Sequence, residues 1–149
     1  MGNGKMENQG WKKSLRGKKI AMNILIVDDS SSMRSIVKTS IHRYQSGGEK
    51  HDYYEAENGK IALDIMQMQE IDILLLDWNM PELDGLELVE KVRSMRKYVS
   101  IPIIMVTAMT SRYDVITAIK AGVTDYVMKP VRDESLWEKI MDYFTDNRE

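Results

Sequence analysis

The run from Ile71 to Leu76 is almost entirely apolar and stops directly at a carboxylate, Asp77. Because such a run has no polar face, it is typical of a strand that helices cover on both sides, and strands of that kind belong to parallel sheets. In open parallel sheets, ligands bind in the crevice at the carboxyl ends of the strands. The sequence therefore predicts that Asp77 lies at a functional edge of a sheet and not in the core.

Strand and helix patterns alternate along the rest of the chain. Apolar or β-branched runs predict further strands at about 23–27, 52–56, 102–107 and 125–128. Apolar residues at helical spacing predict helices from Ser30 to about Tyr44, after Asn58-Gly59, and over about 85–97, 112–121 (ended by Gly122) and 133–146. This alternation implies right-handed crossovers. We therefore expect one α/β domain over residues 22–146, a doubly wound, five-stranded parallel sheet with strand order 2-1-3-4-5.

Chemically distinctive residues stand where four of these strands end. The first strand is followed by Asp28-Asp29 and the third by Asp77, while the fourth ends at Thr107 and the fifth is followed by Lys129. In this strand order the first and third strands are neighbours at the switch point where ligands bind. Three carboxylates meeting there repel one another unless a cation lies among them. Oxygen ligands without His or Cys favour Mg²⁺, although any one of these acids taken alone is more often a turn or cap residue.

Four motifs together resemble the receiver domain of two-component response regulators, and in particular the CheY-like chemotaxis regulators. They are Val27-Asp28-Asp29, Asp77-Trp78-Asn79-Met80-Pro81 with Asp84-Gly85-Leu86-Glu87-Leu88, Met105-Val106-Thr107-Ala108, and Tyr126-Val127-Met128-Lys129-Pro130. Their order and spacing fit residues 22–146. The resemblance implies the flavodoxin/CheY-like (βα)5 fold.

The resemblance also implies a role for each acid at the strand ends. Asp77 matches the phosphoacceptor of the family. Asp28 and Asp29 match the acids that bind Mg²⁺ together with Asp77, with Asp29 favoured as the direct ligand. Asn79 matches the position that contributes its backbone carbonyl to the metal.

Three further positions match the switch residues of the family. Lys129 corresponds to the lysine that pairs with the phosphoryl oxygens, and the Lys129-Pro130 bond is cis in the family pattern. Thr107 corresponds to the hydroxyl that moves to the phosphoryl group. Tyr126 corresponds to the aromatic ring that turns inward when this hydroxyl moves.

The function that the resemblance implies is a phosphorylation-activated switch in a two-component, chemotaxis or motility, signalling system. Its expected partners are a histidine kinase, a phosphatase and a downstream target such as a flagellar motor switch protein, and the chain is expected to be a monomer or weak dimer. Such a switch is not an enzyme, although it assists its own phosphotransfer and autodephosphorylation. One alternative is the receiver domain of a larger regulator whose output domain is missing.

A second alternative is an aspartyl-phosphate hydrolase of the haloacid dehalogenase type, which also uses an aspartate and Mg²⁺. That class has an Asp-x-Asp pair after its first strand. Here the first strand is followed by Asp28-Asp29-Ser30, and no cap domain is evident. The hydrolase is therefore the less favoured reading.

Composition and charge exclude several other classes. The 149 residues include no cysteine, so disulfides and zinc–thiolate sites are excluded, and a cytoplasmic location is expected. No apolar run reaches the 18 residues that a membrane helix needs. Residues 1–19 hold six of the 21 basic and one of the 23 acidic residues, so residues 20–149 have a formal charge of −7. An acidic domain argues against nucleic acid as its ligand.

The first 21 residues are rich in Gly, Asn and Lys and are expected to form a flexible basic tail. A basic arm around Trp11 that binds membrane or nucleic acid remains the alternative. Met109 stands where the CheY-like family pattern has an acid. The resemblance implies that this position borders the path of the hydrolytic water, so we predict that Met109→Glu changes the autodephosphorylation rate. Trp137 flanks a partner-binding face or covers the edge of its own domain, and His42 and His51 are expected to be ordinary surface or helix residues.

Overall fold

The computed structural model describes residues 21–45, 50–78, 84–108, 112–131 and 134–146. The strands are β1 (Asn23–Val27), β2 (Asp52–Ala56), β3 (Ile73–Leu76), β4 (Ile103–Thr107) and β5 (Asp125–Met128). The helices are α2 (Ser31–Tyr44), α3 (Gly59–Met68), α4 (Gly85–Ser94), the 3₁₀ helix η1 (Arg96–Tyr98), α5 (Arg112–Ala121) and α6 (Ser135–Asp146). Every strand and α-helix expected from the sequence is present.

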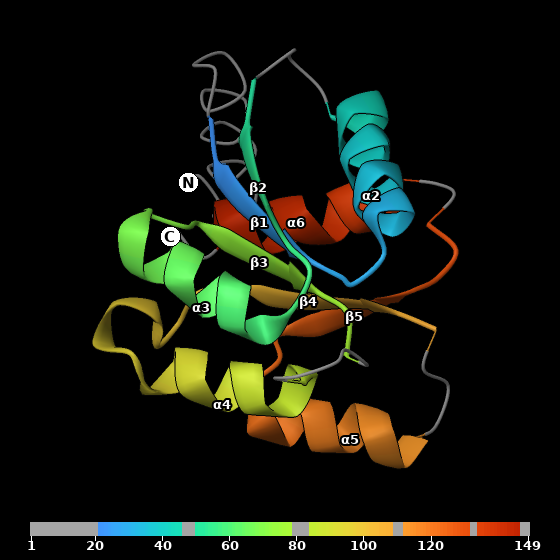
Figure 1. Cartoon of the computed structure of the whole chain (residues 1–149). Coiled ribbons are helices and arrows are strands. Elements are labelled where there is room, and N and C mark those ends of the chain that lie inside the picture. Colours follow the sequence, from blue (N-terminus) through green and yellow to red (C-terminus); the bar gives the residue numbers. More distant parts are fainter. Residues whose placement is uncertain (1–20, 46–49, 79–83, 109–111, 132–133, 147–149) are drawn as a thin grey trace, which may run out of the picture.

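The five strands form one parallel sheet in the order β2-β1-β3-β4-β5, which confirms the predicted topology (Figure 1). All four neighbouring pairs are parallel. In the pairing of β1 with β3, Val27 lies opposite Leu76. The residues that follow these two positions therefore leave the sheet side by side.

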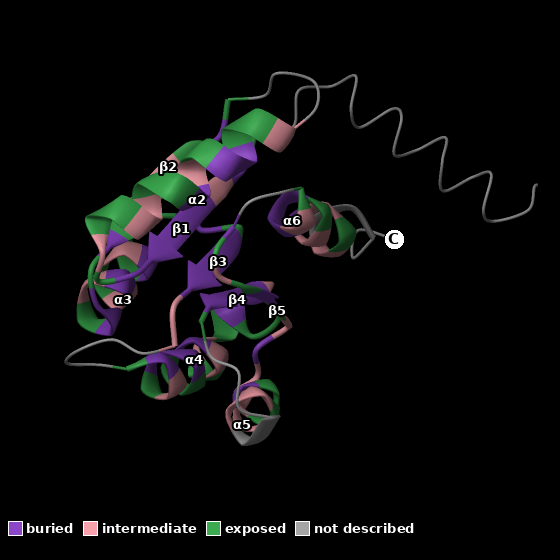
Figure 2. Ribbon diagram, turned by 90° about the vertical axis from the view of Figure 1, so that its right-hand side faces the viewer, coloured by how far each residue is buried: buried purple, intermediate pink, exposed green. Residues whose placement is uncertain are grey.

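Alternate residues of the strands point into two separate cores. Leu25 and Leu74 belong to the core that α3, α4 and α5 cover, whereas Ile24 and Ile73 belong to the core under α2 and α6. Figure 2 shows the central strands as mostly buried between these helices. β1, β3 and β4 are thus apolar on both faces because helices cover both faces, as the run Ile71–Leu76 predicted.

Two of the boundaries that differ from the prediction lie near Tyr98. β3 begins at Ile73, and the Ile71 N–H before it donates to the Tyr98 hydroxyl. The single hydrogen of the same hydroxyl is shared between the main-chain oxygens of Met66, at 2.9 Å, and Gln69, at 2.8 Å, at the end of α3. These bonds hold Tyr98 in the core, and the chain therefore leaves α4 at Ser94 to form η1 instead of continuing to residue 97.

The structure decides the environments of three side chains that the sequence left open or predicted differently. Ile36, one of the apolar residues at helical spacing that predicted α2, is 43% exposed. Trp137 is 8% exposed with its ring centroid 5.9 Å from that of His51, so it packs over the edge of its own domain. His51 is itself buried and accepts a hydrogen bond from the Met22 N–H, so it is a structural residue of the domain and the surface prediction was wrong for it.

Candidate functional site

Asp28 and Asp77 lie next to each other at the carboxyl edge of the sheet. Each directly follows its strand, and the strands pair so that Val27 lies opposite Leu76. The Asp77 N–H donates to the Val27 carbonyl at 2.9 Å, which continues the ladder by one residue. The register of two parallel strands thus sets the separation of the two carboxylates.

Asp29 completes an acidic cluster with these two residues. One carboxylate oxygen of each of Asp28, Asp29 and Asp77 lies within 4.8 Å of the others. Asp28 is buried, Asp77 is half-buried and Asp29 is exposed, so the cluster opens to solvent on one side. The predicted metal ligands with carboxylate side chains therefore come together.

The donor set of this cluster fits Mg²⁺. All three side chains offer oxygen, the ligand atom that Mg²⁺ prefers, and the open side leaves room for the waters that it retains. With Mg–oxygen distances of about 2.1 Å, two ligands on opposite sides of the ion are about 4.2 Å apart. The three carboxylate oxygens lie within 4.8 Å of one another, so small side-chain movements are sufficient to bring them into this range.

The Asp28 carboxylate is held at both oxygens. Its Oδ1 accepts a hydrogen bond from the Ser30 N–H at 2.9 Å, and its Oδ2 lies 3.0 Å from Lys129 Nζ. Ser30 also caps α2, since its hydroxyl accepts from the Met33 N–H. The start of α2 therefore sets both the direction of the chain and the orientation of Asp28.

Lys129 reaches the cluster from β5, two strands away from β3. Its Nζ lies 3.7 Å from Asp77 Oδ2 in addition to its contact with Asp28. Its main-chain N–H donates to the Thr107 carbonyl at 2.8 Å, and the peptide bond to Pro130 is cis, as the family pattern implies. The ammonium group is placed to offset part of the negative charge of the cluster.

Thr107 and Tyr126, the two expected switch residues, lie in different environments. Thr107 ends β4 with 1% of its surface exposed, whereas Tyr126 in the edge strand β5 is 36% exposed. β4 and β5 pair so that Met105 lies opposite Tyr126. Thr107 lies opposite Met128, two residues after Tyr126. Tyr126 is therefore close to Thr107 along the sheet, but it is partly exposed to solvent.

Asn79 and Met109 lie outside the described residues, so their predicted roles stay predictions. Trp78, which follows Asp77, is half-buried and packs on the core. The Trp78 carbonyl accepts from the Gly85 N–H at 3.0 Å, and a Cβ at Gly85 would lie 2.8 Å from the Trp78 Cα and oxygen. Only glycine lets α4 begin this close to Trp78, the residue that follows Asp77.

Sequence reasoning missed one residue that touches the cluster. Arg34 in α2 donates through Nη1 to the main-chain oxygen of Asp28 at 2.6 Å. No local motif indicated this contact, because an arginine on the first turns of a helix is usually a solvated side chain. Only the packing of α2 against the end of β1 shows it.

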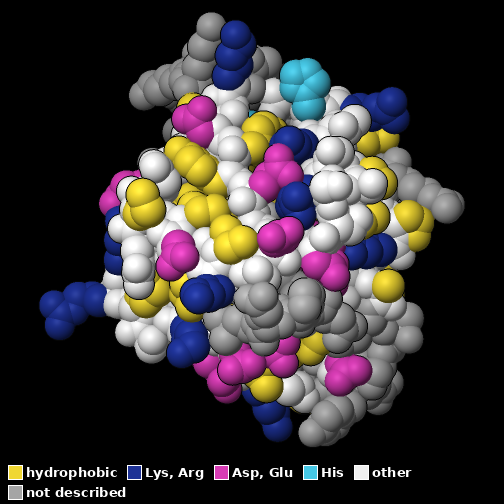
Figure 3. Space-filling model, in the orientation of Figure 1, with side chains coloured by type: hydrophobic (Ala, Val, Ile, Leu, Met, Phe, Trp, Pro, Cys, Tyr) yellow, Lys and Arg dark blue, Asp and Glu magenta, His cyan; other side chains and the backbone are white. Residues whose placement is uncertain are grey.

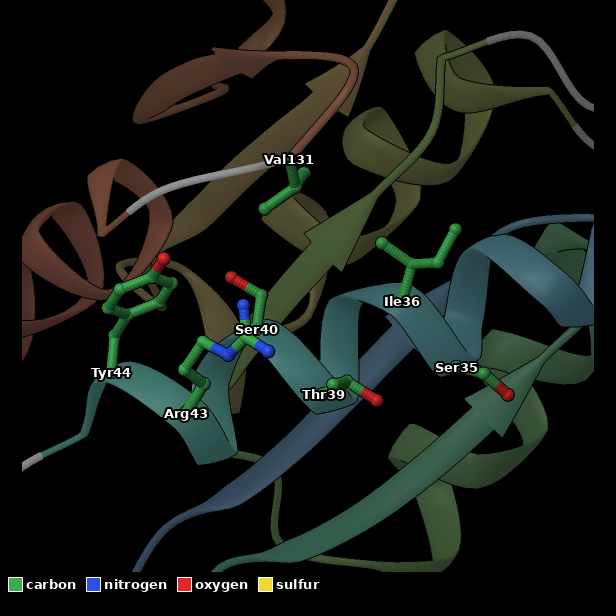
Figure 4. Close-up of a pocket in the computed structure, with 7 residues that line it drawn as sticks. All are labelled: Ser35, Ile36, Thr39, Ser40, Arg43, Tyr44 and Val131. Carbon is green, nitrogen blue, oxygen red and sulfur yellow. The ribbon is translucent and has the colours of Figure 1, made fainter.

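Apart from the acidic cluster, a hollow lies along α2, between this helix and the segment after β5 (Figure 4). It has a volume of about 240 Å³ and is lined by Ser35, Ile36, Thr39, Ser40, Arg43, Tyr44 and Val131. Ile36 lines this hollow, which accounts for its exposure. Ser40 is 7% exposed, and its hydroxyl has no hydrogen-bond partner among the residues that the structure describes.

The charged surface is mixed in sign. On the face shown in Figure 3, the acidic and basic side chains of the described residues are interspersed. This part of the surface therefore offers no continuous basic stripe to nucleic-acid phosphates. Among the helices that the structure describes, none has the length and apolar character that crossing a bilayer requires.

The family model for the response regulator receiver domain matches residues 24–141. A chemotaxis protein CheY homolog of Campylobacter jejuni is 48% identical over 122 residues, which cover 81% of this chain and 91% of the relative. Chemotaxis protein CheY1 of Helicobacter pylori is 46% identical over 120 residues, covering 80% and 94% of the two chains. The chain therefore belongs to the response regulator receiver domain family.

The similarity in three dimensions agrees with this assignment. The structure of CheY4, a chemotaxis protein of Vibrio cholerae, superposes with a TM-score of 0.73 at 30% identity, covering 82% of this chain and 98% of that one. A CheY-like receiver domain protein from Methanospirillum hungatei superposes with a TM-score of 0.74 at 26% identity, covering 87% and 100%. Within its family, the chain is a receiver domain of the CheY type of chemotaxis response regulator.

Proposed function

We propose that this receiver is a phosphorylation-activated switch in which Asp77 accepts a phosphoryl group from a phosphohistidine of a histidine kinase. The observation that carries the proposal is the convergence of Asp28, Asp29 and Asp77 within 4.8 Å, with Lys129 beside two of them. A phosphoryl acceptor needs positioning and neutralisation of charge more than it needs a strong nucleophile. This cluster supplies both.

Each residue has a distinct part in the transfer. An oxygen of Asp77 attacks phosphorus as the bond to the histidine nitrogen breaks, and the phosphoryl group becomes an acyl phosphate on Asp77. Mg²⁺ held by the three carboxylates supplies positive charge against the phosphoryl oxygens. Asp28 and Asp29 hold that charge in place, and the Lys129 ammonium exchanges its contact with Asp77 for one with a phosphoryl oxygen.

The new charge then acts on β4 and β5. A phosphoryl group brings between one and two negative charges and strong acceptor oxygens. The Thr107 hydroxyl donates to one of these oxygens, and the space that it leaves accepts the ring of Tyr126. Phosphorylation thereby shifts the population between two arrangements of this edge, since the second arrangement makes contacts that the first one lacks.

The resulting role is that of a signalling protein without repeated turnover. It takes its phosphoryl group from a histidine kinase, loses it to water with the help of a phosphatase, and binds a downstream target such as a flagellar motor switch protein. The names of its relatives from Campylobacter jejuni and Helicobacter pylori support a chemotaxis role. These partners place it in the cytoplasm.

The test is labelling with a small-molecule phosphodonor such as acetyl phosphate in the presence of Mg²⁺. We expect one acid-stable, base-labile phosphoryl group per chain in the wild type, none in Asp77→Asn, and none in the presence of EDTA. We also expect Trp78 emission to change when Mg²⁺ is added. Asp72→Asn, which alters an exposed carboxylate before β3, serves as the matched control and keeps wild-type labelling.

Phosphate that remains bound after Asp77 is replaced overturns the proposal. So does steady release of phosphate from esters over many turnovers, which is the behaviour of an aspartyl-phosphate hydrolase. Absence of any response of Trp78 to Mg²⁺ argues against a metal site next to Asp77.

A further inference from the structure

Both main-chain polar groups of Asp28, its N–H and its carbonyl, form hydrogen bonds. Its N–H donates to the Ala56 carbonyl at 3.0 Å, at the end of the edge strand β2. Its carbonyl accepts from Arg34 Nη1 at 2.6 Å. That carbonyl belongs to the peptide that joins Asp28 to Asp29, so the Arg34 contact sets the plane of the peptide that presents Asp29.

The side chain of Asp29 has little else to hold it. It is exposed, and within the described part of the chain no hydrogen bond or ion pair reaches its carboxylate. The position of this carboxylate therefore depends on the main chain from which it extends. A contact that fixes the Asp28–Asp29 peptide consequently orients the most exposed of the three carboxylates.

Arg34 is itself fixed by a partner on β2. Its Nε lies 2.8 Å from Glu55 Oε1, and the other oxygen of Glu55 lies 2.6 Å from Lys38 Nζ. Hydrogen bonds from Lys38 and Arg34 lower the pKa of Glu55, so this carboxylate is ionised at neutral pH. Only 15% of the Arg34 side chain is exposed.

We propose that Arg34, oriented by Glu55, is a positioning residue that holds the Asp28–Asp29 peptide so that Asp29 meets a divalent cation. The proposal rests on the proposed function only in requiring that the acidic cluster bind that cation. Arg34 does not touch the cation or the phosphoryl group. It acts through the backbone and connects the edge strand β2 to the cluster.

The charge of Arg34 and its hydrogen bond to the Asp28 carbonyl predict opposite effects on Mg²⁺ binding when Arg34 is replaced. This difference makes the proposal testable. A cation near three carboxylates weakens the binding of another cation by Coulomb repulsion, so loss of charge alone strengthens Mg²⁺ binding. Loss of a group that orients a metal ligand weakens binding, by about 10- to 100-fold at well-studied metal sites. Lys38 offers a matched control, because it pairs with the same Glu55 and makes no contact with Asp28.

The experiment is a Mg²⁺ titration of the wild type, Arg34→Met, Arg34→Lys and Lys38→Met, followed by Trp emission and by the amide NMR signal of Asp29. We expect Arg34→Met and Arg34→Lys to weaken Mg²⁺ binding about ten-fold. Lysine keeps the charge but cannot bond Glu55 and the Asp28 carbonyl with one rigid group. We expect Lys38→Met to bind as tightly as the wild type, or more tightly.

A second readout needs no metal. In EDTA, the Asp29 amide signal shifts in both Arg34 variants and stays in place in Lys38→Met, because only Arg34 holds that peptide. Thermal unfolding in EDTA shows which variants are folded, and Arg34→Lys remains informative if Arg34→Met does not fold.

Two results overturn this inference. Unchanged or tighter Mg²⁺ binding in both Arg34 variants shows that Arg34 acts by charge or not at all, while the labelling of Asp77 and the proposed function stand. A wild-type protein that does not respond to Mg²⁺ contradicts the proposed function as well.

Discussion

Lys129 Nζ lies 3.0 Å from Asp28 Oδ2, although the two residues are 101 positions apart in the chain. The same ammonium group lies 3.7 Å from Asp77 Oδ2. The ammonium group of Lys129, directly after β5, thus offsets negative charge on two carboxylates that directly follow β1 and β3. It also competes with a divalent cation for the same oxygens, so the stability of the metal-free domain and its Mg²⁺ affinity are coupled at this residue.

Lys129→Met tests that coupling. Without Mg²⁺ we expect a loss of up to about 3 kcal/mol in the free energy of unfolding, because Asp28 is left as a buried, unpaired charge. With its competitor removed, Mg²⁺ binds more tightly than in the wild type and recovers more of the stability. Urea unfolding with and without Mg²⁺ measures both effects, and equal Mg²⁺ stabilisation of variant and wild type contradicts the competition.

Gly85→Ala tests the close approach of α4 to Trp78. An added Cβ would lie 2.8 Å from main-chain atoms of Trp78, so either α4 or the segment after Asp77 must move. We expect the free energy of unfolding to fall by about 1–3 kcal/mol, the usual cost of overpacking. The measurement is urea unfolding together with the Trp emission maximum; unchanged stability and emission show that the helix start is more tolerant than the contact implies.

Ser40→Ala is expected to stabilise the domain. The buried Ser40 hydroxyl has no hydrogen-bond partner within the described part of the chain, and alanine removes this unsatisfied group while it favours the helix (Figure 4). We expect the free energy of unfolding to rise by about 1 kcal/mol, measured by thermal or urea unfolding. Ser35→Ala, at an exposed position of the same helix, reports the gain from helix propensity alone. If Ser40→Ala raises the unfolding free energy no more than Ser35→Ala does, the buried hydroxyl of Ser40 does not destabilise the domain.

Glu55 predicts a pH dependence of stability. Its pKa is lowered mainly by the hydrogen bonds from Lys38 and Arg34, so its pKa is lower in the folded than in the unfolded chain. The stabilisation is therefore complete above the unfolded pKa and is lost as the pH falls toward the folded pKa. We expect the difference in unfolding free energy between wild type and Glu55→Gln to shrink from pH 7 to pH 3.

Glu90→Gln is the control for this titration, because Glu90 is exposed on α4 and forms no ion pair with the described residues. Its difference from the wild type is expected to vary less with pH than that of Glu55→Gln. Two parallel curves show that the network of Glu55 with Arg34 and Lys38 does not contribute to stability.

Local pattern was sufficient to predict which segments form strands and helices, whereas the strand order 2-1-3-4-5 came from the doubly wound fold that their alternation and the family resemblance imply. A run such as Ile71–Leu76 is buried on both faces, and its length and flanking residues separate strand from helix without any knowledge of contacts. Near the boundary errors at Ile73 and Ser94, the Tyr98 hydroxyl makes hydrogen bonds to main-chain groups that are distant in the sequence. Contacts of that range leave no periodic signal.

The sequence by itself determined which chemical groups stand at the strand ends, because a carboxylate or ammonium group that interrupts an apolar run is visible in the chain. It also placed Asp28, Asp29 and Asp77 at one edge, since parallel strands share their carboxyl ends. Tertiary structure decided the buried places of Trp137 and His51 and the contact of Arg34 with the Asp28 carbonyl. The physical reason is that side-chain contacts between elements depend on how helices lie against the sheet to within an ångström, and the hydrophobic pattern specifies only which face is covered.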